Sequence, residues 1–416
     1  MQQHCQNDPM TTSPASVVVG SPTAPATPLT GRNFLLLLTA TVLACTNFAP
    51  LLSVLPLWSA QAGAGVGGLG GITGTMMAAT VGVQVLMPWI LNRFGLRLVF
   101  AVGALLLGPP TLAYSASADL TWVLAISVVR GVGFGMVVVS GSALAATLVA
   151  ESRRGTAVGL YGMAVGVPHV LALPLGVWYA QNVGFAAVFT TTGLLCTAAV
   201  LMLALMTQPR GVQRPGGTES NPSETTGLTW LLRRLATPWV VMLACACATG
   251  GVTSFFALAQ PELAPAALFV LYLGVVAGRW GGGVLSDRTA PGRLTLPGLT
   301  AAFLGMSGVA LAAGSTTTTA VTVLALAAAA LYGAGFGTVQ NDTLVVMFQR
   351  AGPAGTGSAS TVWNLGYDAG LGCGALVMGM LATALGIPGA FAVSAAAMLL
   401  ITPLVWRDGR RVRAEG

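Results

Sequence analysis

Five side chains that could carry a charge or a proton lie inside long apolar runs of this chain: Arg130, His169, Arg279, Asp342 and Asp368. If these runs cross a lipid bilayer, a charge near the middle costs about 2.5–3.5 kcal/mol on insertion scales. Each charged group therefore needs a partner or a function. Arg130 lies about 13 Å into its run and Asp368 about 15 Å into its own from the opposite end, so both are near the midplane.

Arg130 and Asp368 each have a chemical and a structural interpretation. Arg130 would meet an anionic group or a coupling carboxylate, or it would bond to backbone carbonyls. Asp368 would carry a proton or face a cationic ligand, or it would cap a helix kink beside its neighbouring glycines. We favour the chemical role for Asp368, with Asp342 as a second proton carrier, and the sequence leaves Arg130 open.

Arg279 and Asp342 share a second depth, near one end of their runs. We predict an ion pair between them, possibly joined by Asp287, with a mainly structural role. His169 could change its charge near neutral pH. A lone histidine beside prolines is more often a hydrogen-bonded packing residue, so we favour the structural interpretation for His169.

The densest polar and aromatic cluster is formed by Trp363, Asn364, Tyr367 and Asp368. Trp363 and Tyr367 are four residues apart and share a helix face, as do Asn364 and Asp368. One broad surface could therefore present rings together with a carboxylate, although Trp363 is near enough to its helix end to be an interfacial anchor. Uncharged polar side chains inside other runs could line a cavity between the helices, namely Asn47, Gln84, Gln340 and Asn341.

Composition predicts the elements that hold these side chains. Hydrophobic residues make up 55% of the 416-residue chain and charged residues 7%, and the mean hydropathy is +0.80. Such a chain belongs mostly in lipid. The long, evenly apolar runs predict helices rather than the short alternating strands of a barrel. We expect an all-α membrane protein with twelve spans, near 34–58, 69–91, 98–118, 121–149, 156–180, 185–207, 238–259, 266–286, 294–314, 320–347, 358–383 and 390–406.

The arginines predict the orientation of these spans. All 18 basic residues are arginines, and all except Arg130 and Arg279 fall in tails or in loops on one side of the predicted bilayer. By the positive-inside rule, both termini face the cytoplasm and the chain lies in the cytoplasmic membrane. The net charge of +7 is thus no sign of nucleic-acid binding.

An internal repeat divides the chain. Arg130–Gly135 matches Tyr332–Gly337 at an offset of 202 residues, and Gly155 falls on Gly357 at the same offset. The halves therefore look like parallel copies of a six-helix bundle. The expected organisation is a disordered tail at 1–31, bundles at 32–207 and 238–407, a cytoplasmic linker at 208–237 and a tail at 408–416.

Two short basic loops occupy corresponding places in the halves. The first contains Asn92, Arg93, Gly95 and Arg97, and the second runs from Gly283 through Asp287 and Arg288 to Arg293. With the glycine-rich Arg130 segment and the mid-chain linker, they resemble the major facilitator superfamily. The family's loop carries Gly and Asp-Arg where the second copy has Gly283 and Asp287-Arg288, whereas the first copy has Asn92 in place of Asp.

This resemblance implies a secondary active transporter that works by alternating access. Its basic loops would act as gating latches. We expect its energy to come from protons, and we favour export of a drug-like compound or metabolite because the core is largely apolar and rich in glycine. Uptake of a small metabolite and a transport-inactive sensor are the alternatives. We expect a monomer in the lipid bilayer with no enzyme activity, cofactor or metal. The candidate substrate contacts are Asn47, Arg130, His169, Trp363, Asn364, Tyr367 and Asp368.

Overall fold

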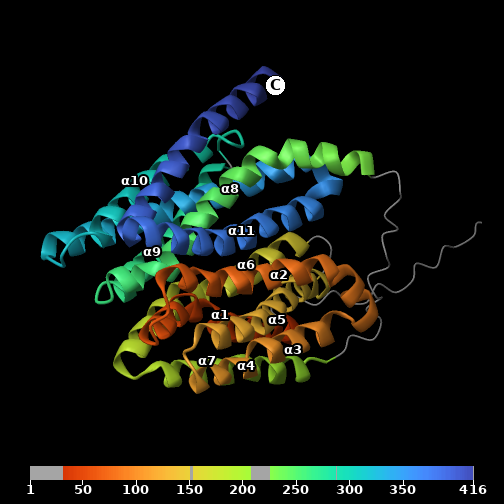
Figure 1. The fold of residues 1–416 in the computed structure, drawn as a ribbon. Helices are drawn as coiled ribbons and strands as arrows, with labels where there is room; N and C mark the ends of the chain where they lie inside the picture. Colours follow the sequence, from red (N-terminus) through yellow and green to blue (C-terminus); the bar gives the residue numbers. More distant parts are fainter. Residues whose placement is uncertain (1–30, 150–152, 208–224, 287, 416) are drawn as a thin grey trace, which may run out of the picture.

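The fold is described from a computed structural model, covering residues 31–149, 153–207, 225–286 and 288–415. The N-terminal half (31–207) contains α1 (Arg32–Gln61), α2 (Val66–Phe94), α3 (Leu96–Leu107), α4 (Pro109–Leu112), the 3₁₀ helix η1 (Ala113–Ala116), α5 (Leu120–Thr147), α6 (Arg154–Asn182) and α7 (Phe185–Ala204). The C-terminal half (225–415) contains α8 (Thr225–Ala259), α9 (Ala264–Ser286), α10 (Thr295–Ala313) and α11 (Thr319–Glu415). Figure 1 shows the two halves as two groups of helices that lie against each other.

Eleven helical segments in the described part of the chain are long and apolar enough to cross a membrane. The last of them, Ser358–Asp408, has 51 residues. At 1.5 Å per residue it would be about 77 Å long if straight, more than twice the roughly 30 Å of hydrocarbon in a bilayer. It is not straight, because the backbone leaves the helical conformation at Gly386.

Gly386 has a counterpart in the other half. Its φ is 71°, and Gly184, which lies 202 residues earlier between α6 and α7, has a φ of 123°. Both values are in a region that residues with a side chain rarely adopt, so glycine permits the reversal at each position. Together with a third such residue, Gly352 (φ 70°), Gly386 divides α11 into three helical parts. The repeat offset therefore reappears in the backbone conformation.

The repeated glycine segment also packs in the same way in each half. In α5, a Cβ added to Gly131 would lie 2.2 Å from the carbonyl oxygen of Met76 in α2. In α11, a Cβ at Gly333, 202 residues later, would lie 2.0 Å from that of Leu271 in α9. These glycines let helices approach backbone to backbone, and their matching neighbours show that the repeat is structural.

One predicted span is interrupted. The run at 98–118 folds as α3, α4 and η1, with the break at Gly108. Pro109 and Pro110 follow Gly108 and have no backbone N–H, so the helix of α3 cannot continue through them with its normal hydrogen bonds. The break turns Thr111 and Tyr114 toward the interior, where both are fully buried.

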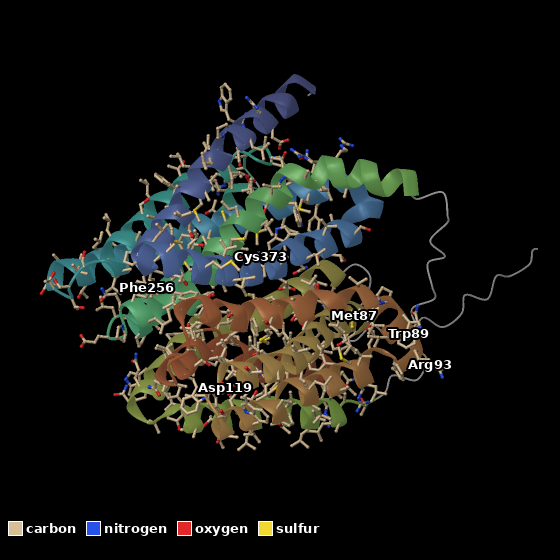
Figure 2. All side chains as sticks on the ribbon, viewed as in Figure 1. Met87, Trp89, Arg93, Asp119, Phe256 and Cys373 are labelled. Carbon is tan, nitrogen blue, oxygen red and sulfur yellow. The ribbon has the colours of Figure 1, made fainter. Side chains whose placement is uncertain are left out.

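The surface carries large apolar side chains, as expected for helices in lipid. Trp89, Trp280 and Leu400 are 67%, 75% and 79% exposed, among many others. A soluble protein seldom shows so much apolar surface. Figure 2 shows Trp89 beside Arg93 at one end of the molecule, with Asp119 and Phe256 toward the other. We call these the Gly95 end and the Gly63 end, after the turns between α2 and α3 and between α1 and α2.

The two halves contact each other closely toward the Gly63 end. There α2 packs on α11, and a Cβ at Gly70 would lie 2.1 Å from the carbonyl oxygen of Ala375. Hydrogen bonds join Thr73 to Ser254 (3.2 Å) and Gln181 to the carbonyl of Pro261 (2.8 Å), and the Ser53 hydroxyl donates to the carbonyl of Thr253.

Helices extend into two of the segments predicted to lie outside the bundles. α8 begins at Thr225, within the stretch 208–237 that was expected as a linker. α11 runs to Glu415, through the stretch from residue 408 that was expected as a tail. Polar composition marks where a helix leaves the apolar part of the bilayer, but it does not mark where the helix ends. The predicted tail at 1–31 lies outside the described residues except for Gly31.

Candidate functional site between the two halves

Asp368 lies on the surface between the two halves, near the middle of its helix. Its Oδ2 accepts a hydrogen bond of 2.8 Å from Nε2 of Gln84 in α2, and the Asp368 side chain is buried. This is a direct contact between a carboxylate of the C-terminal half and an amide of the N-terminal half. The interpretation of Asp368 as a cap of its own helix kink receives no support from this geometry.

The predicted cluster around Asp368 divides into two parts. Trp363 and Tyr367 stack nearly parallel, with ring centroids 6.2 Å apart, and the Trp363 indole N–H donates to Thr343 at 3.2 Å. Asn364 is exposed and donates to the carbonyl of Ser360 on its own helix. The structure therefore brings the two rings together, as their spacing predicts, and leaves Asn364 apart from them.

Arg279 lies beside the Trp363 and Tyr367 rings and does not pair with Asp342. Its guanidinium carbon lies 5.9 Å from the Trp363 ring centroid, and its Nη1 donates to Oε1 of Gln340 at 3.1 Å. The predicted ion pair between Arg279 and Asp342 is not formed in this conformation. Gln340 and Asp342 are two residues apart on one helix, which places them about 200° apart around its axis. A shared depth was therefore not enough to bring Asp342 toward Arg279.

Asp342 holds the second basic loop in place. Its Oδ1 accepts from the backbone N–H of Gly292 at 3.0 Å, and its Oδ2 accepts from the hydroxyl of Thr295 at 2.6 Å. The carboxylate is fully buried and satisfied within the C-terminal half. Its geometry is that of a loop anchor, and it does not lie on the surface between the halves. The suggested third partner, Asp287, lies outside the described residues.

In the described residues of the two basic loops, which exclude Asp287, no hydrogen bond or ion pair joins the halves in this conformation. In the first loop, Gly95 has a φ of 78°, and Nη2 of Arg97 donates to the carbonyl of Ala204 at the end of α7, within the same half. Figure 2 places Arg93 at this end of the molecule. In the second loop, Gly283 is near Asn341 of its own half. Asn92 lies beside Arg93 in the last turn of α2, and Arg288 and Arg293 lie in the turn that contains Gly292.

Arg130 is the largest fully buried side chain in the described residues. Nη2 donates to Oδ1 of Asn47 at 2.9 Å, and Nη1 donates to the Tyr114 hydroxyl at 3.3 Å, while the guanidinium stands over the Tyr114 ring at 5.4 Å. Asn47 in turn donates to Thr111 at 2.9 Å. These partners are neutral and belong to the N-terminal half. Arg130 therefore organises the interior of this half and does not contact Asp368.

His169 lies where α6 packs against α9 of the other half. Its Nδ1 is 3.2 Å from the carbonyl oxygen of Val165, one turn earlier in α6. Its ring is 5.7 Å from that of Phe48 and 5.3 Å from that of Tyr272 in α9. The structure therefore places His169, like Asp368, on the surface between the halves.

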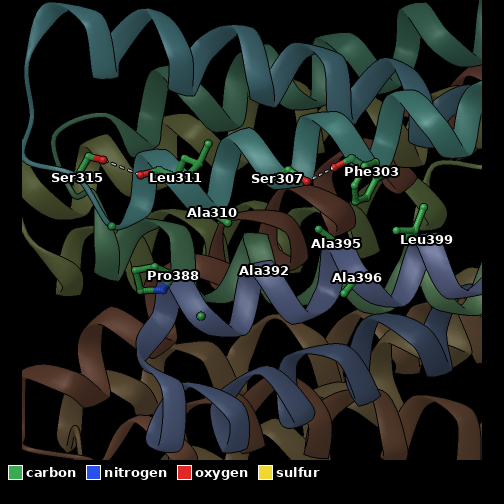
Figure 3. A pocket seen from close by; sticks show the side chains of 12 residues that line it. Phe303, Ser307, Ala310, Leu311, Ser315, Pro388, Ala392, Ala395, Ala396 and Leu399 are labelled. Atoms are coloured by element: carbon green, nitrogen blue, oxygen red, sulfur yellow. Dashed lines mark hydrogen bonds between the residues drawn. The ribbon is translucent and has the colours of Figure 1, made fainter.

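One hollow in the described residues lies apart from these candidates. It has a volume of about 660 Å³ and lies between α10 and the part of α11 after Gly386, as Figure 3 shows. Small and apolar residues line it, among them Ala310, Pro388 and Ala396. It contains none of the candidate residues and no charged side chain, so we do not assign the functional site to it.

Sequence reasoning missed two participants. Tyr114 was not singled out, although the Gly108-Pro109-Pro110 break that positions it is visible in the sequence. Tyr272 was treated as one residue in an apolar run. No local pattern marks it, because its importance comes from its position opposite His169 on another helix.

Comparison with known proteins identifies the family. Residues 37–370 match the pattern of the Major Facilitator Superfamily, and the chain belongs to it. It is similar in fold to a bacterial homologue of the human lysosomal transporter Spinster in an inward-facing conformation, with 15% identity over 92% of this chain and 98% of that one and a TM-score of 0.70. It is also similar to the nucleoside transporter NupG, with 11% identity over 90% and 98% and a TM-score of 0.73. No protein of curated function matches its sequence.

These comparisons make the chain a multi-pass membrane protein with a transporter fold rather than an enzyme. They confirm the family that the basic loops and the Arg130 segment indicated. At these identities the solved structures inform on the fold alone, so the role of each residue has to be argued from the geometry of this chain.

Proposed function

We propose that this protein is a secondary active transporter that moves a small molecule across the cytoplasmic membrane by alternating access, coupled to protons. The observation that carries the proposal is the hydrogen bond from Gln84 to Asp368. It places an ionisable group at mid-depth on the surface where the two halves must separate. Protonation of that group would change a contact between the halves directly, as coupling requires.

The proposal includes twelve spans in two six-helix bundles. Gly352 and Gly386 divide α11 into three parts, each long enough to span a bilayer, and α3, α4 and η1 together form one span. Six spans then fall on each side of the segment between α7 and α8. This organisation agrees with the matching glycine contacts of the two halves.

The proposed orientation places the Gly95 end in the cytoplasm. Arg93, Arg97, Arg293 and Arg350 lie at this end, beside Gly95, Gly292 and Gly352, whereas the turns at the Gly63 end carry Asp119 and Glu262. Because the contacts between the halves lie toward the Gly63 end, the structure would be closed to the outside and open to the cytoplasm. Latches formed by the basic loops would then belong to the opposite, outward-open state.

Export of a drug-like compound or metabolite is the direction we propose, because apolar and aromatic side chains dominate the surface between the halves. Uptake of a small metabolite is the second candidate. The observation that favours uptake is the pair of buried polar atoms on His169 and Tyr272, which would select one hydrogen-bonding group and not a broad range of compounds.

The test uses proteoliposomes loaded with the pH-sensitive dye pyranine. A panel of antibiotics, dyes and nucleosides is added with and without an imposed pH gradient, and proton movement is followed for the wild type and for empty vesicles. We expect at least one compound to move protons only when the protein is present. Binding of a compound without proton or compound flux under any gradient would instead indicate a sensor with this fold.

A further inference from the structure

Two buried polar atoms face the boundary between the halves without a hydrogen-bond partner in the described residues: Nε2 of His169 and the hydroxyl of Tyr272. The two side chains are 6% and 4% exposed, and their ring centroids are 5.3 Å apart. Buried polar groups are nearly always paired, and leaving one unpaired costs free energy. Two such side chains whose rings lie against each other, one from each half, indicate a place where something else completes the hydrogen bonds.

The chemistry of His169 defines what that group must supply. A carbonyl oxygen can only accept, so the contact of Nδ1 with Val165 requires the proton to be on Nδ1. In the neutral imidazole, Nε2 is then an acceptor and needs a donor. The Tyr272 hydroxyl can donate or accept. An O–H or N–H group between the two side chains would therefore satisfy His169, and an adjacent acceptor lone pair would satisfy Tyr272.

The surroundings favour a flat, uncharged ligand. Phe48 stacks on Phe134 with ring centroids 3.8 Å apart and presents its ring to His169. Together with Tyr272, these rings form an aromatic wall that favours a planar ring system. Asp368 is bonded to Gln84, and Arg130 is bonded to Asn47 and Tyr114 within the N-terminal half, although Nε of Arg130 has no partner in the described residues.

We propose that His169 and Tyr272 form a substrate subsite that recognises a neutral, planar heterocyclic compound through one O–H or N–H donor. This inference rests on the proposed transport function and deepens it. The two residues belong to α6 and α9, so a ligand held by both joins the halves across the surface that alternating access must open. The subsite thus links recognition of the donor to the conformational change.

The test compares matched ligands that differ by one methyl group. Theophylline has an N–H that caffeine lacks, and benzimidazole has an N–H that 1-methylbenzimidazole lacks. Binding of each compound to the full-length protein in lipid nanodiscs is measured by equilibrium dialysis. We expect the donor member of at least one pair to bind about ten-fold more tightly than its methylated partner.

Variants test whether this preference comes from His169 and Tyr272. His169→Leu should remove most of the ten-fold difference, whereas His169→Gln, which keeps an acceptor, should retain part of it. Tyr272→Phe should weaken the binding of both members of a pair, because the Tyr272 hydroxyl pairs with the acceptor of the ligand. Tyr332→Phe is the matched control, because its hydroxyl is already bonded to Thr249 at 2.6 Å and to the carbonyl of Cys245 at 3.0 Å. This control should keep the wild-type preference even if its stability falls.

Three results would overturn the subsite. They are equal binding within both pairs, no binding by either donor compound, and wild-type preference in His169→Leu. The same dialysis distinguishes this failure from failure of the transport proposal. Donor-dependent binding in a protein that shows no flux would support the subsite and contradict the transport proposal. Flux that does not depend on His169 and Tyr272 would support transport and contradict the subsite.

Discussion

The side-chain amide of Gln84 in α2 donates a 2.8 Å hydrogen bond to Oδ2 of Asp368 in α11, joining the two halves of the chain near the middle of the helices. An ionised carboxylate accepts this bond strongly, and a protonated one accepts it more weakly. The protonation state of Asp368 therefore bears directly on how firmly α2 and α11 hold together. Gln84→Leu should weaken the dependence of transport on the proton gradient while leaving Asp368 in place, as measured by flux at several imposed pH differences. Gradient dependence equal to that of the wild type would argue against this bond.

Gly70 should control closure at the Gly63 end. A methyl group there would meet the carbonyl oxygen of Ala375 at 2.1 Å, which is impossible without separating α2 from α11. Gly70→Ala should therefore shift the population toward the state open at this end. The shift is measured by alkylation of a cysteine introduced at Ser53 in a cysteine-free background.

Gly71→Ala is the matched control for this change. Its added methyl group would lie 3.8 Å from the nearest atom, a methyl carbon of Leu124, which is an ordinary contact. Labelling of the Ser53 cysteine should rise several-fold in the Gly70 variant and stay unchanged in the Gly71 variant. Equal labelling in the two would mean that the contact between α2 and α11 does not close this end.

Asp342 should prove structural. Asp342→Asn replaces the carboxylate that accepts from Gly292 and Thr295, so we expect a loss of about 1–3 kcal/mol in stability, seen as a lower Tm. Thr295→Val, which removes one of these bonds, should lower the Tm less. Proton-dependent flux of the folded protein should persist in both. Loss of proton dependence with an unchanged Tm in Asp342→Asn would return Asp342 to the coupling role.

The stability of the protein should depend on the neutral side chains that hold Arg130. Asn47→Ala leaves Nη2 of a fully buried guanidinium without its acceptor, at a cost of about 1–3 kcal/mol. Tyr114→Phe removes the acceptor of the longer bond but keeps the ring under the guanidinium, so its effect should be smaller. Thermal unfolding in nanodiscs measures which of the two variants loses more stability. A larger loss in Tyr114→Phe than in Asn47→Ala would contradict this account of the network.

The sequence predicted the helices of this fold well because their signal is local. A run of about 20 apolar residues with arginines at its cytoplasmic end defines a span whatever surrounds it. The repeat is local in the same sense, since the offset that relates Gly133 to Gly335 also relates Gly184 to Gly386. Helix ends beyond the lipid were predicted less well, since the start of α8 at Thr225 lies in a polar stretch with no apolar pattern.

The sequence predicted how deep the candidate residues lie along their helices, but not toward which neighbours their side chains point. Counting residues placed Arg279 and Asp342 at one level, yet the two side chains point to different neighbours, Gln340 and Thr295. The stacked pair Trp363 and Tyr367 was predictable because both residues lie on one helix face. The contact of His169 with Tyr272 was not, because it depends on how two helices from different halves pack.

The most direct test of proton coupling compares wild-type protein with Asp368→Asn in pyranine-loaded proteoliposomes, using a compound that the wild type transports. The variant keeps the shape of the side chain but cannot bind and release a proton. We predict that it exchanges the compound between equal pools on the two sides, yet neither moves protons nor transports uphill under a pH gradient. Proton-coupled flux at the wild-type rate in Asp368→Asn would contradict the account.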